Sequence, residues 1–287
     1  MFFKNSRSSK FFKMFLTLIH PKLGLKKEEY NLIKTADLIV SKGQESYTGS
    51  YGIIHFVDSF FESYICSRVS NKVILLGHSI GPIKNKFQRY LLKYTIQNFK
   101  KIYIRDSISK KALEHISYKN YEEIDDMAYN ATKLFNTNIP KKKKVLIFPN
   151  KAIVKNNSIN LYINNLQKII KHFISLDYKV GIASSVKAKD WNNDYIITKH
   201  ILSKNSKVED IKISNLEEFM YQIKSSKIVV SSRLHPIILA SDLNCSIVAL
   251  SDAPKVYGIL QKIKTKYKIL NPLNITNNEI LSLHESI

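Results

Sequence analysis

One short stretch of the sequence gathers side chains that could bind an anion and transfer a proton, Ser231–Pro236. Arg233 carries a planar guanidinium that suits phosphate or carboxylate groups. His235 can give or take a proton near neutral pH, and Lys255 follows after the next apolar run. These residue types fit chemistry on a phosphorylated or carboxylated substrate. The alternative is a helix-capping arginine, a half-buried histidine and a surface lysine.

The elements around this stretch would expose backbone donors beside it. Residues 227–230 form a β-branched apolar run, which predicts a buried strand. Residues 237–240 predict a helix, with Pro236 suited to its first position. Because the first N–H groups of a helix have no partner within the helix, a strand that runs into a helix is a ready anion site.

The rest of the chain repeats this pattern of short apolar runs followed by helical segments, which is typical of α/β folds with parallel sheets. The expected strands cover residues 38–41, 72–77, 101–104, 145–149, 179–183, 227–230 and 247–250. Ligands of such sheets lie at the carboxyl ends of the strands. Arg105, Arg233 and Lys255 all follow expected strands directly or within a few residues.

A polar break divides the chain into two halves of the same pattern. It runs from Asn136 to Lys144 and ends in four consecutive lysines. We interpret it as a linker. The sequence therefore predicts two Rossmann-like lobes with a central cleft, one covering residues 1–140 and the other 141–287.

Composition limits the function further. The 287 residues carry a formal charge of +22, from 45 Lys and Arg against 23 Asp and Glu. The lysines are dispersed, and no RNA-binding motif, zinc-finger spacing or basic recognition helix is present, so we expect a solvated basic surface and no nucleic-acid partner. The cysteines Cys66 and Cys245 form no disulfide framework, which fits a reducing cytoplasm. We expect neither a bound metal nor a cofactor.

The start of the chain combines aromatic and basic residues. The stretch Phe11–Ile19 resembles a weak signal peptide, but Lys13 interrupts it and it is too short to span a bilayer. It predicts either a helix packed on the domain or a helix resting on a membrane surface. The second alternative would place a cytoplasmic protein at the inner face of the membrane.

Five segments, taken in order, resemble the polysaccharide pyruvyl transferase family, whose fold is like that of GT-B glycosyltransferases. They are Ala36–Gly43, Leu75–Pro82, Ile104–Ser109, Ile124–Tyr129, and Ser232–His235 with Pro254–Val256. Two features depart from the family pattern. The first strand usual in the family is missing, so the N-terminal lobe looks shortened, and the turn after Gly43 lacks a second glycine.

The resemblance implies a pyruvyl transferase that uses phosphoenolpyruvate as donor substrate. The product would be a pyruvate ketal across two hydroxyls of a sugar, in a cell-surface polysaccharide or a lipid-linked oligosaccharide precursor. It implies that Arg105, His235 and Lys255 hold the donor with Arg233 beside them. His235 would be the catalytic acid. The alternative for Arg105 is an ion-paired strand end in which Asp106 caps the next helix.

On the acceptor side, three residues are candidates. His78 could face the acceptor, Asp125 could accept a proton from its hydroxyl, and Tyr47 could stack on a sugar ring. Each has a simpler alternative: a loop histidine bonded to the backbone, a solvated carboxylate, and a packed tyrosine.

Two further functions stay open. One is a GT-B glycosyltransferase that uses a nucleotide sugar. The other is a non-catalytic, truncated relative that binds anionic surfaces.

Overall fold

The computed structural model describes most of the chain beyond its first 24 residues. The described residues are 25–43, 47–48, 53–83, 85–133, 135, 137–154, 156–187 and 193–283, with the single residues 16, 20 and 22. Side chains are not described at 53–55, 58–60, 62, 130, 156, 254 and 255. The stretch Phe11–Ile19, predicted to pack on the domain or on a membrane, lies outside the description apart from Leu16.

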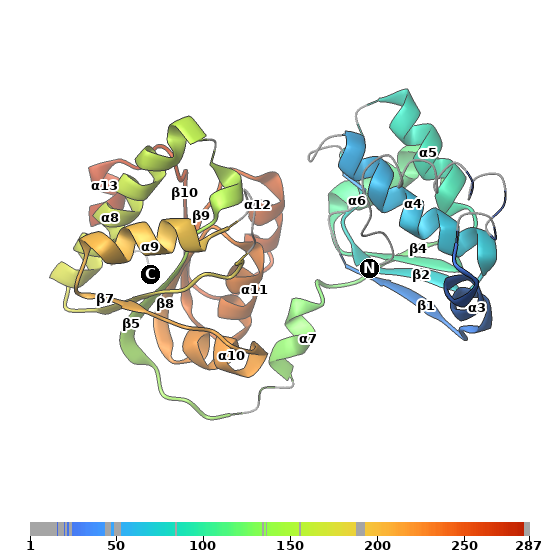
Figure 1. Cartoon of the computed structure of the whole chain (residues 1–287). Coiled ribbons are helices and arrows are strands. Elements are labelled where there is room, and N and C mark those ends of the chain that lie inside the picture. The colour runs from blue at the N-terminus through green and yellow to red at the C-terminus, as the bar shows by residue number, and fades with distance from the viewer. Residues whose placement is uncertain are drawn as a thin grey trace. The chain divides into compact units, whose positions relative to one another are not determined.

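Two compact units make up the chain, Met1–Met127 and Ala128–Ile287. Figure 1 shows the first in blue to green and the second in green to red. The sequence-predicted division at residue 140 falls inside the second unit. The helix α7 (Ala128–Lys133) belongs to that unit because it packs on α11 (Leu234–Asp242).

The first unit is built on a four-stranded parallel sheet whose strands follow the chain order, β1-β2-β3-β4. Its strands are β1 (Ile39–Lys42), β2 (Val73–His78), β3 (Lys101–Ile104) and β4 (Tyr121–Glu123). Its helices are α3 (Lys27–Thr35), α4 (Ile53–Val69), α5 (Lys86–Ile96) and α6 (Ser107–His115). Right-handed crossovers in one direction place the connecting helices on one face of a sheet, and Figure 1 shows this arrangement.

The core of this unit lies between the sheet and those helices. Val73, Leu75 and Ile102 point to the helices and are buried. On the other face, Val40 is 47% exposed and Ile74 is only half-buried. Because side chains alternate between the faces of a strand, the apolar side chains that point away from the helices stay partly exposed.

The second unit holds a six-stranded parallel sheet in the order β10-β9-β8-β5-β6-β7. The strands are β5 (Lys142–Phe148), β6 (Lys179–Ile182), β7 (Val208–Asp210), β8 (Ser226–Ser231), β9 (Ser246–Leu250) and β10 (Tyr267–Leu270). Besides α7 and α11, the helices are α8 (Ile159–Ser175), α9 (Tyr195–Lys204), α10 (Leu216–Lys224), α12 (Pro254–Leu260) and α13 (Asn277–Leu281), with short 3-10 turns η2 (Lys151–Ile153) and η3 (Asn156–Ser158). Numbered from its first strand, this is the doubly wound Rossmann order.

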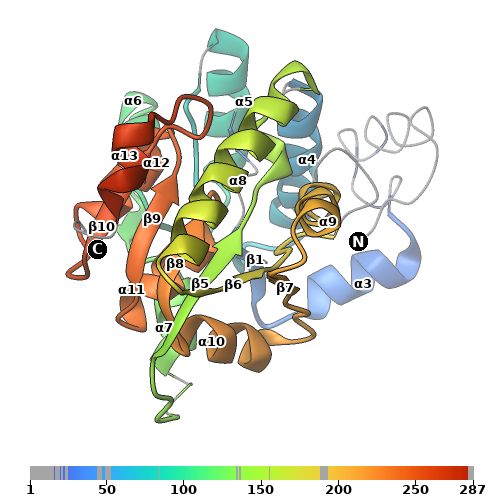
Figure 2. The same ribbon diagram turned by 90° about the vertical axis from the view of Figure 1, so that its left-hand side faces the viewer.

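Both faces of this sheet are covered. Val145 and Ile147 pack under α8, whereas Leu146 and Phe148 belong to the core on the side of α10 and α11. Figure 1 shows helices on both sides of the strands, and Figure 2 shows α8 crossing in front of them. A strand buried on both faces needs a continuous apolar run, which β5 has in residues 145–148. The predicted α/β architecture with parallel sheets is confirmed.

Candidate functional site

The strand order of the second unit reverses between β5 and β8, which pair in parallel. Crevices at the carboxyl ends of strands beside such a reversal are the usual ligand sites of doubly wound sheets. Two segments lie at the carboxyl ends of these strands, Pro149–Lys151 after β5 and Ser232–Arg233 after β8. The motif found in the sequence therefore lies where the topology predicts a ligand.

Arg233 is held by a carboxylate that the sequence analysis missed. Its Nη2 donates to Oδ1 of Asp194 at 2.6 Å, and its Nε donates to Oδ2 at 3.0 Å. Asp194 is completely buried, and its carboxylate also accepts the backbone N–H groups of Lys151 at 2.9 Å and Val186 at 3.2 Å. This bidentate pair fixes the plane of the guanidinium. Arg233 is therefore a cation held in a fixed position, and the buried carboxylate of Asp194 balances its charge.

The backbone around Arg233 is fastened as well. The Oγ of Ser231 accepts the N–H of Arg233 and donates to its carbonyl, both at 2.9 Å. Asn150 Nδ2 donates to the Ser232 carbonyl at 3.1 Å, and the hydroxyls of Ser232 and Tyr162 lie 2.7 Å apart. Burial raises the pKa of Tyr162 to about 12, so this phenol stays protonated. These bonds connect the loop after β5 to the loop after β8 and hold both in place.

His235 stands at the start of α11 and is exposed. Arg233 is the N-cap of the helix, His235 its second residue and Pro236 its third. The sequence placed Pro236 at the first position instead. Because the first turn makes no internal N–H bond, the proline breaks none at either place. An exposed histidine in the first turn of a helix can contact an anion bound at the helix N-terminus.

Lys255 lies in the first turn of α12, which follows β9, and its side chain is outside the description. A different lysine, Lys151, lies at the carboxyl end of β5. Lys151 is only 8% exposed, and among the described residues no ion pair involves it. Its side chain runs along covered surface at the strand end, where its ammonium group can meet a bound anion. Its position within three residues of the end of a predicted strand, like that of Arg233, was the signal that could have found it.

In the first unit, Arg105 lies directly after β3 and is nearly buried. Its Nη1 donates to Oδ2 of buried Asp126 at 2.8 Å, and its Nε donates to Oγ of Ser79 at 3.0 Å. Asp106 accepts the N–H of Ser109 at 2.8 Å and so caps α6. The alternative of an ion-paired strand end is thus present in the structure. Arg105 is on a separate unit from Arg233 and His235.

His78 is buried at the end of β2 and bonded to the backbone. Its Nε2 lies 3.0 Å from the carbonyl of Ser41 and 3.0 Å from the Ser41 hydroxyl. Because a carbonyl only accepts, Nε2 carries the proton, and buried Nδ1 has no partner in the structure. Burial, aided by the charge of Arg105, lowers the pKa of His78 to about 4. The imidazole is therefore neutral at physiological pH.

This histidine should make the protein sensitive to acid. The unfolded chain binds a proton at the ordinary pKa of 6.5 and the folded chain only near 4, so stability falls as the pH drops from 6.5 to 4. The loss amounts to about 3 kcal/mol at most. We expect His78→Gln to flatten the pH dependence of urea unfolding across this window, while the half-buried control His200→Gln retains it. Equal slopes in wild type and His78→Gln would contradict the assignment.

The other two acceptor-side candidates lie in different surroundings. Tyr47 is completely buried, its hydroxyl donates to Oγ of Ser63, and its ring centroid lies 5.5 Å from that of His78. This environment corresponds to the packing alternative. Asp125 is exposed, and its neighbour Asp126 is the buried carboxylate that holds Arg105.

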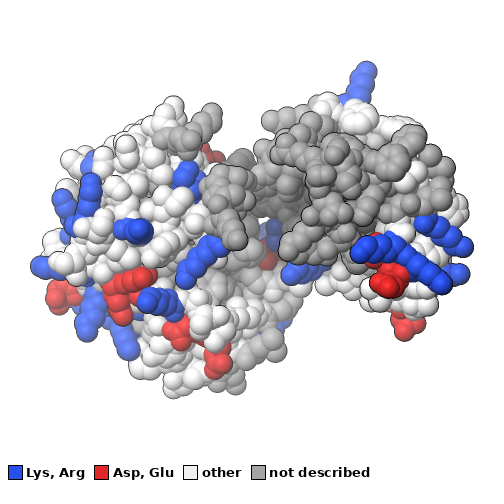
Figure 3. Space-filling view, in the orientation of Figure 1, with Lys and Arg blue, Asp and Glu red and all other residues white. Residues whose placement is uncertain are grey.

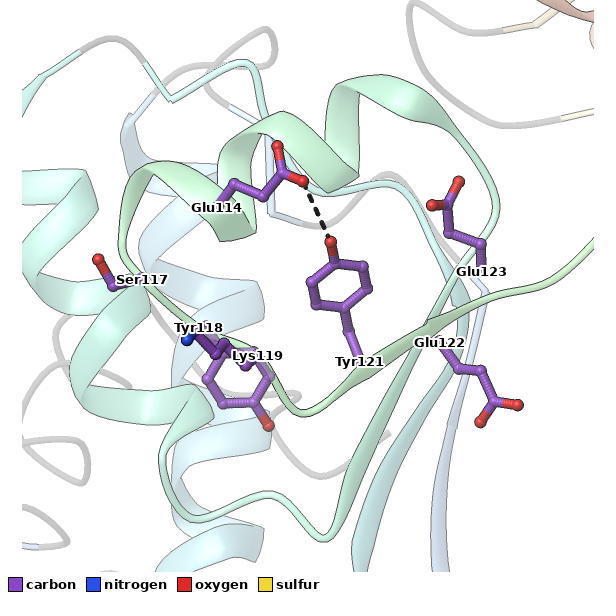
Figure 4. A pocket seen from close by; sticks show the side chains of 7 residues that line it. All are labelled: Glu114, Ser117, Tyr118, Lys119, Tyr121, Glu122 and Glu123. Atoms are coloured by element: carbon purple, nitrogen blue, oxygen red, sulfur yellow. Dashed lines mark hydrogen bonds between the residues drawn. The ribbon is translucent and has the colours of Figure 1, made fainter.

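A cavity of about 650 Å³ opens elsewhere in the first unit, between the end of α6 and β4. Figure 4 shows Tyr121 pointing to Glu114, to which it donates a hydrogen bond of 3.4 Å. Two of its carboxylates, Glu122 and Glu123, are already paired with Lys101 and Lys110. The cavity is lined in part by the loop that leads into the amino end of β4, opposite to where ligands of parallel sheets bind. We therefore place the candidate site at the carboxyl ends of β5 and β8.

Other features of the described residues concern metals, membranes and charge. Among them, no group of three or more His, Cys, Asp and Glu side chains could hold a metal ion. None of the helices in the described part of the chain has the length and apolarity to cross a bilayer. Figure 3 shows Lys and Arg scattered over the visible face, with Asp and Glu among them.

Comparisons with known proteins agree with this picture. A sequence model of the family described as polysaccharide pyruvyl transferase matches residues 3–253. No curated protein sequence matches the chain.

Solved structures with a similar fold include several UDP-N-acetylglucosamine 2-epimerases. A proposed UDP-N-acetylglucosamine 2-epimerase from Listeria monocytogenes is 13% identical, with 90% of this chain and 69% of that chain covered and a TM-score of 0.59. MnaA of S. aureus, solved with UDP, is 10% identical, with 99% and 71% covered and a TM-score of 0.59. The UDP-GlcNAc 2-epimerase of Methanocaldococcus jannaschii, solved with UDP-GlcNAc and UDP, is 12% identical, with 98% and 75% covered and a TM-score of 0.55. At these identities the likeness shows a shared GT-B-like fold.

Proposed function

Because this chain belongs to the polysaccharide pyruvyl transferase family, we propose that it transfers the enolpyruvyl group of phosphoenolpyruvate to a sugar. The product is a pyruvate ketal across two hydroxyls of a cell-surface polysaccharide or its lipid-linked precursor, and phosphate is released. One observation carries the proposal. Exposed His235 lies two residues after Arg233, which the buried Asp194 holds in place where the strand order reverses.

The donor carries a phosphate and a carboxylate, so its site needs several fixed cations. In the second unit Arg233, Lys151 and the first-turn N–H groups of α11 supply them, and Lys255 adds a fourth group. Such groups stabilise charge that grows on the departing phosphate.

In the reaction we propose, His235 donates a proton to the methylene carbon of the enol, which becomes the methyl group of the product. The neighbouring carbon, now electron-poor, is attacked by one sugar hydroxyl, which loses its proton. The bond from this carbon to the phosphate oxygen then breaks, and the phosphate leaves with the electron pair. The second hydroxyl attacks and closes the ketal. Of the two hydroxyl protons, one restores His235 and the other leaves on phosphate.

We also propose that this enzyme is located in the cytoplasm. Both Cys66 and Cys245 are free thiols, as is usual for proteins of a reducing compartment. Two acceptor-side residues, Asp125 and His78, have different parts in the proposal. Exposed Asp125 can take up the proton of an acceptor hydroxyl before that proton reaches His235 or phosphate, whereas neutral, buried His78 positions the loop after β2.

The buried lysine gives a specific test of the donor site. Lys151→Met should weaken phosphoenolpyruvate binding by about 10- to 100-fold, because a hydrogen bond between charged groups is removed. Its melting temperature without ligand should stay about the same, because methionine keeps most of the covered side-chain stem. Titration calorimetry checks this, with Lys171→Met on the exposed side of α8 as the control. Unchanged affinity would exclude Lys151 from the donor site.

A second candidate function is a transferase or epimerase that uses a nucleotide sugar. The observation in its favour is the shared fold with enzymes solved in complex with UDP or UDP-GlcNAc. Ligand choice separates the two functions. Binding of UDP-GlcNAc without binding of phosphoenolpyruvate would favour the second, and binding of neither would favour a non-catalytic relative that binds anionic surfaces.

A further inference from the structure

The helix α5 presents an exposed aromatic stripe. Phe87, Tyr90 and Tyr94 are 57%, 67% and 44% exposed. Their spacing of three and four residues places them on one side of the helix. The opposite side, with Leu92 and Ile96, is buried in the core of the first unit. Large apolar groups gathered on one exposed helix face usually mark a contact surface.

The tyrosines of this stripe are held in place before any partner binds. The rings of Tyr90 and Tyr94 are stacked, with centroids 6.2 Å apart and planes at 11°. Tyr94 in turn stacks on Tyr64 of α4 at 5.7 Å and 28°, and Tyr64 is buried. Little side-chain freedom is therefore lost when the stripe meets a partner.

The chain segment that contains the stripe carries charge of a single sign. Residues 63–105 contain no Asp or Glu and nine Lys or Arg. Lys86 and Lys93 are exposed on α5 and lie seven residues apart, two turns along the same side. Residues 128–176 of the second unit form another such run, so the aromatic stripe beside the lysines is what distinguishes α5. A partner for this surface should be anionic.

The shape of the surface narrows the partner further. In Figure 1, α5 lies on the helix-covered side of the first unit, away from the strands. A single helix presents a convex ridge, which suits a flat partner. An acidic polysaccharide would instead need ring faces open for stacking, and the ring of Tyr94 already stacks on both Tyr64 and Tyr90.

We propose that α5 is a docking surface for an anionic lipid bilayer. Phe87, Tyr90 and Tyr94 enter the headgroup region, where aromatic side chains are favourable. Lys86 and Lys93 meet the negative lipid headgroups. Docking here would bring the first unit to the membrane that carries lipid-linked sugars. The surface shares no residue with the proposed donor site, so vesicle binding and catalysis are tested separately.

The test is flotation of the full chain with vesicles of phosphatidylcholine, with or without phosphatidylglycerol. We expect binding only when phosphatidylglycerol is present, and loss of binding at high salt. Both Phe87→Ser/Tyr90→Ser and Lys86→Glu/Lys93→Glu should weaken binding by about tenfold or more. All four side chains are exposed, so melting temperatures should stay unchanged.

Matched controls come from the second unit. Tyr195→Ser/Tyr221→Ser and Lys171→Glu/Lys199→Glu replace two aromatic and two basic side chains at exposed positions. These variants should bind like the wild type. Equal binding of the α5 variants and the wild type would overturn the proposal, as would no binding of the wild type to any vesicle. Binding to a soluble acidic polysaccharide but not to vesicles would overturn it in favour of a glycan partner.

Discussion

Replacing His235 with alanine should lower the rate of phosphate release from phosphoenolpyruvate by about 100- to 10,000-fold in the presence of a competent acceptor extract. The proposed reaction begins with proton donation to carbon, and no other histidine lies in the first turn of α11. Because His235 is exposed, the substitution should leave the melting temperature unchanged. A phosphate-release assay and a thermal melt of the same preparation check both expectations.

The matched control is His200→Ala, which removes a half-buried histidine from α9 of the same unit. It should retain the rate of the wild type. Binding of phosphoenolpyruvate should weaken less than turnover in His235→Ala, because Arg233 and Lys151 remain. Turnover of His235→Ala at the wild-type rate would remove the histidine from the mechanism.

Replacing Asp194 with alanine should destabilise the second unit by about 3–5 kcal/mol. The substitution leaves Arg233 without its bidentate partner and removes the acceptor of the Lys151 and Val186 N–H groups. Urea unfolding followed by circular dichroism checks this expectation.

Two variants make this test specific. Asp177→Asn removes a carboxylate whose side chain is 97% exposed, and it should change stability by no more than about 0.5 kcal/mol. The double variant Asp194→Leu/Arg233→Met replaces the whole pair by apolar groups and should be more stable than Asp194→Ala. If Asp194→Ala unfolds at the same urea concentration as the wild type, the Asp194–Arg233 pair does not stabilise the carboxyl ends of the strands in the six-stranded sheet.

The central strands could be predicted because they are buried. Residues 145–148 and 227–230 are apolar runs in the middle of the six-stranded sheet, where both faces are covered. Three strands were not predicted, β4 (Tyr121–Glu123), β7 (Val208–Asp210) and β10 (Tyr267–Leu270). All three lie at the edge of a sheet and are three or four residues long. An edge strand needs less apolar surface, so its sequence carries little signal.

Composition predicted a linker over residues 136–144, whereas in the structure the end of this stretch belongs to a strand. The lysine run Lys141–Lys144 enters β5, where Lys144 is buried and its Nζ donates to Oε1 of Gln222 at 2.6 Å. A lysine whose stem packs along apolar surface looks like a solvated charge in the sequence. The placement of Arg105 and Arg233 at strand ends could be predicted from motif and topology. Their buried partners, Asp126 and Asp194, could not, because each comes from a distant segment that only the fold brings near.

The most direct test of the account is a thermal-shift titration of the wild-type chain with phosphoenolpyruvate, with UDP-GlcNAc and inorganic phosphate in parallel. At about 100 times its dissociation constant, a ligand stabilises the folded state by about 2.7 kcal/mol. The account predicts a clear rise in melting temperature with phosphoenolpyruvate, a smaller one with phosphate and none with UDP-GlcNAc. A rise with UDP-GlcNAc alone, or with none of the three, would contradict it.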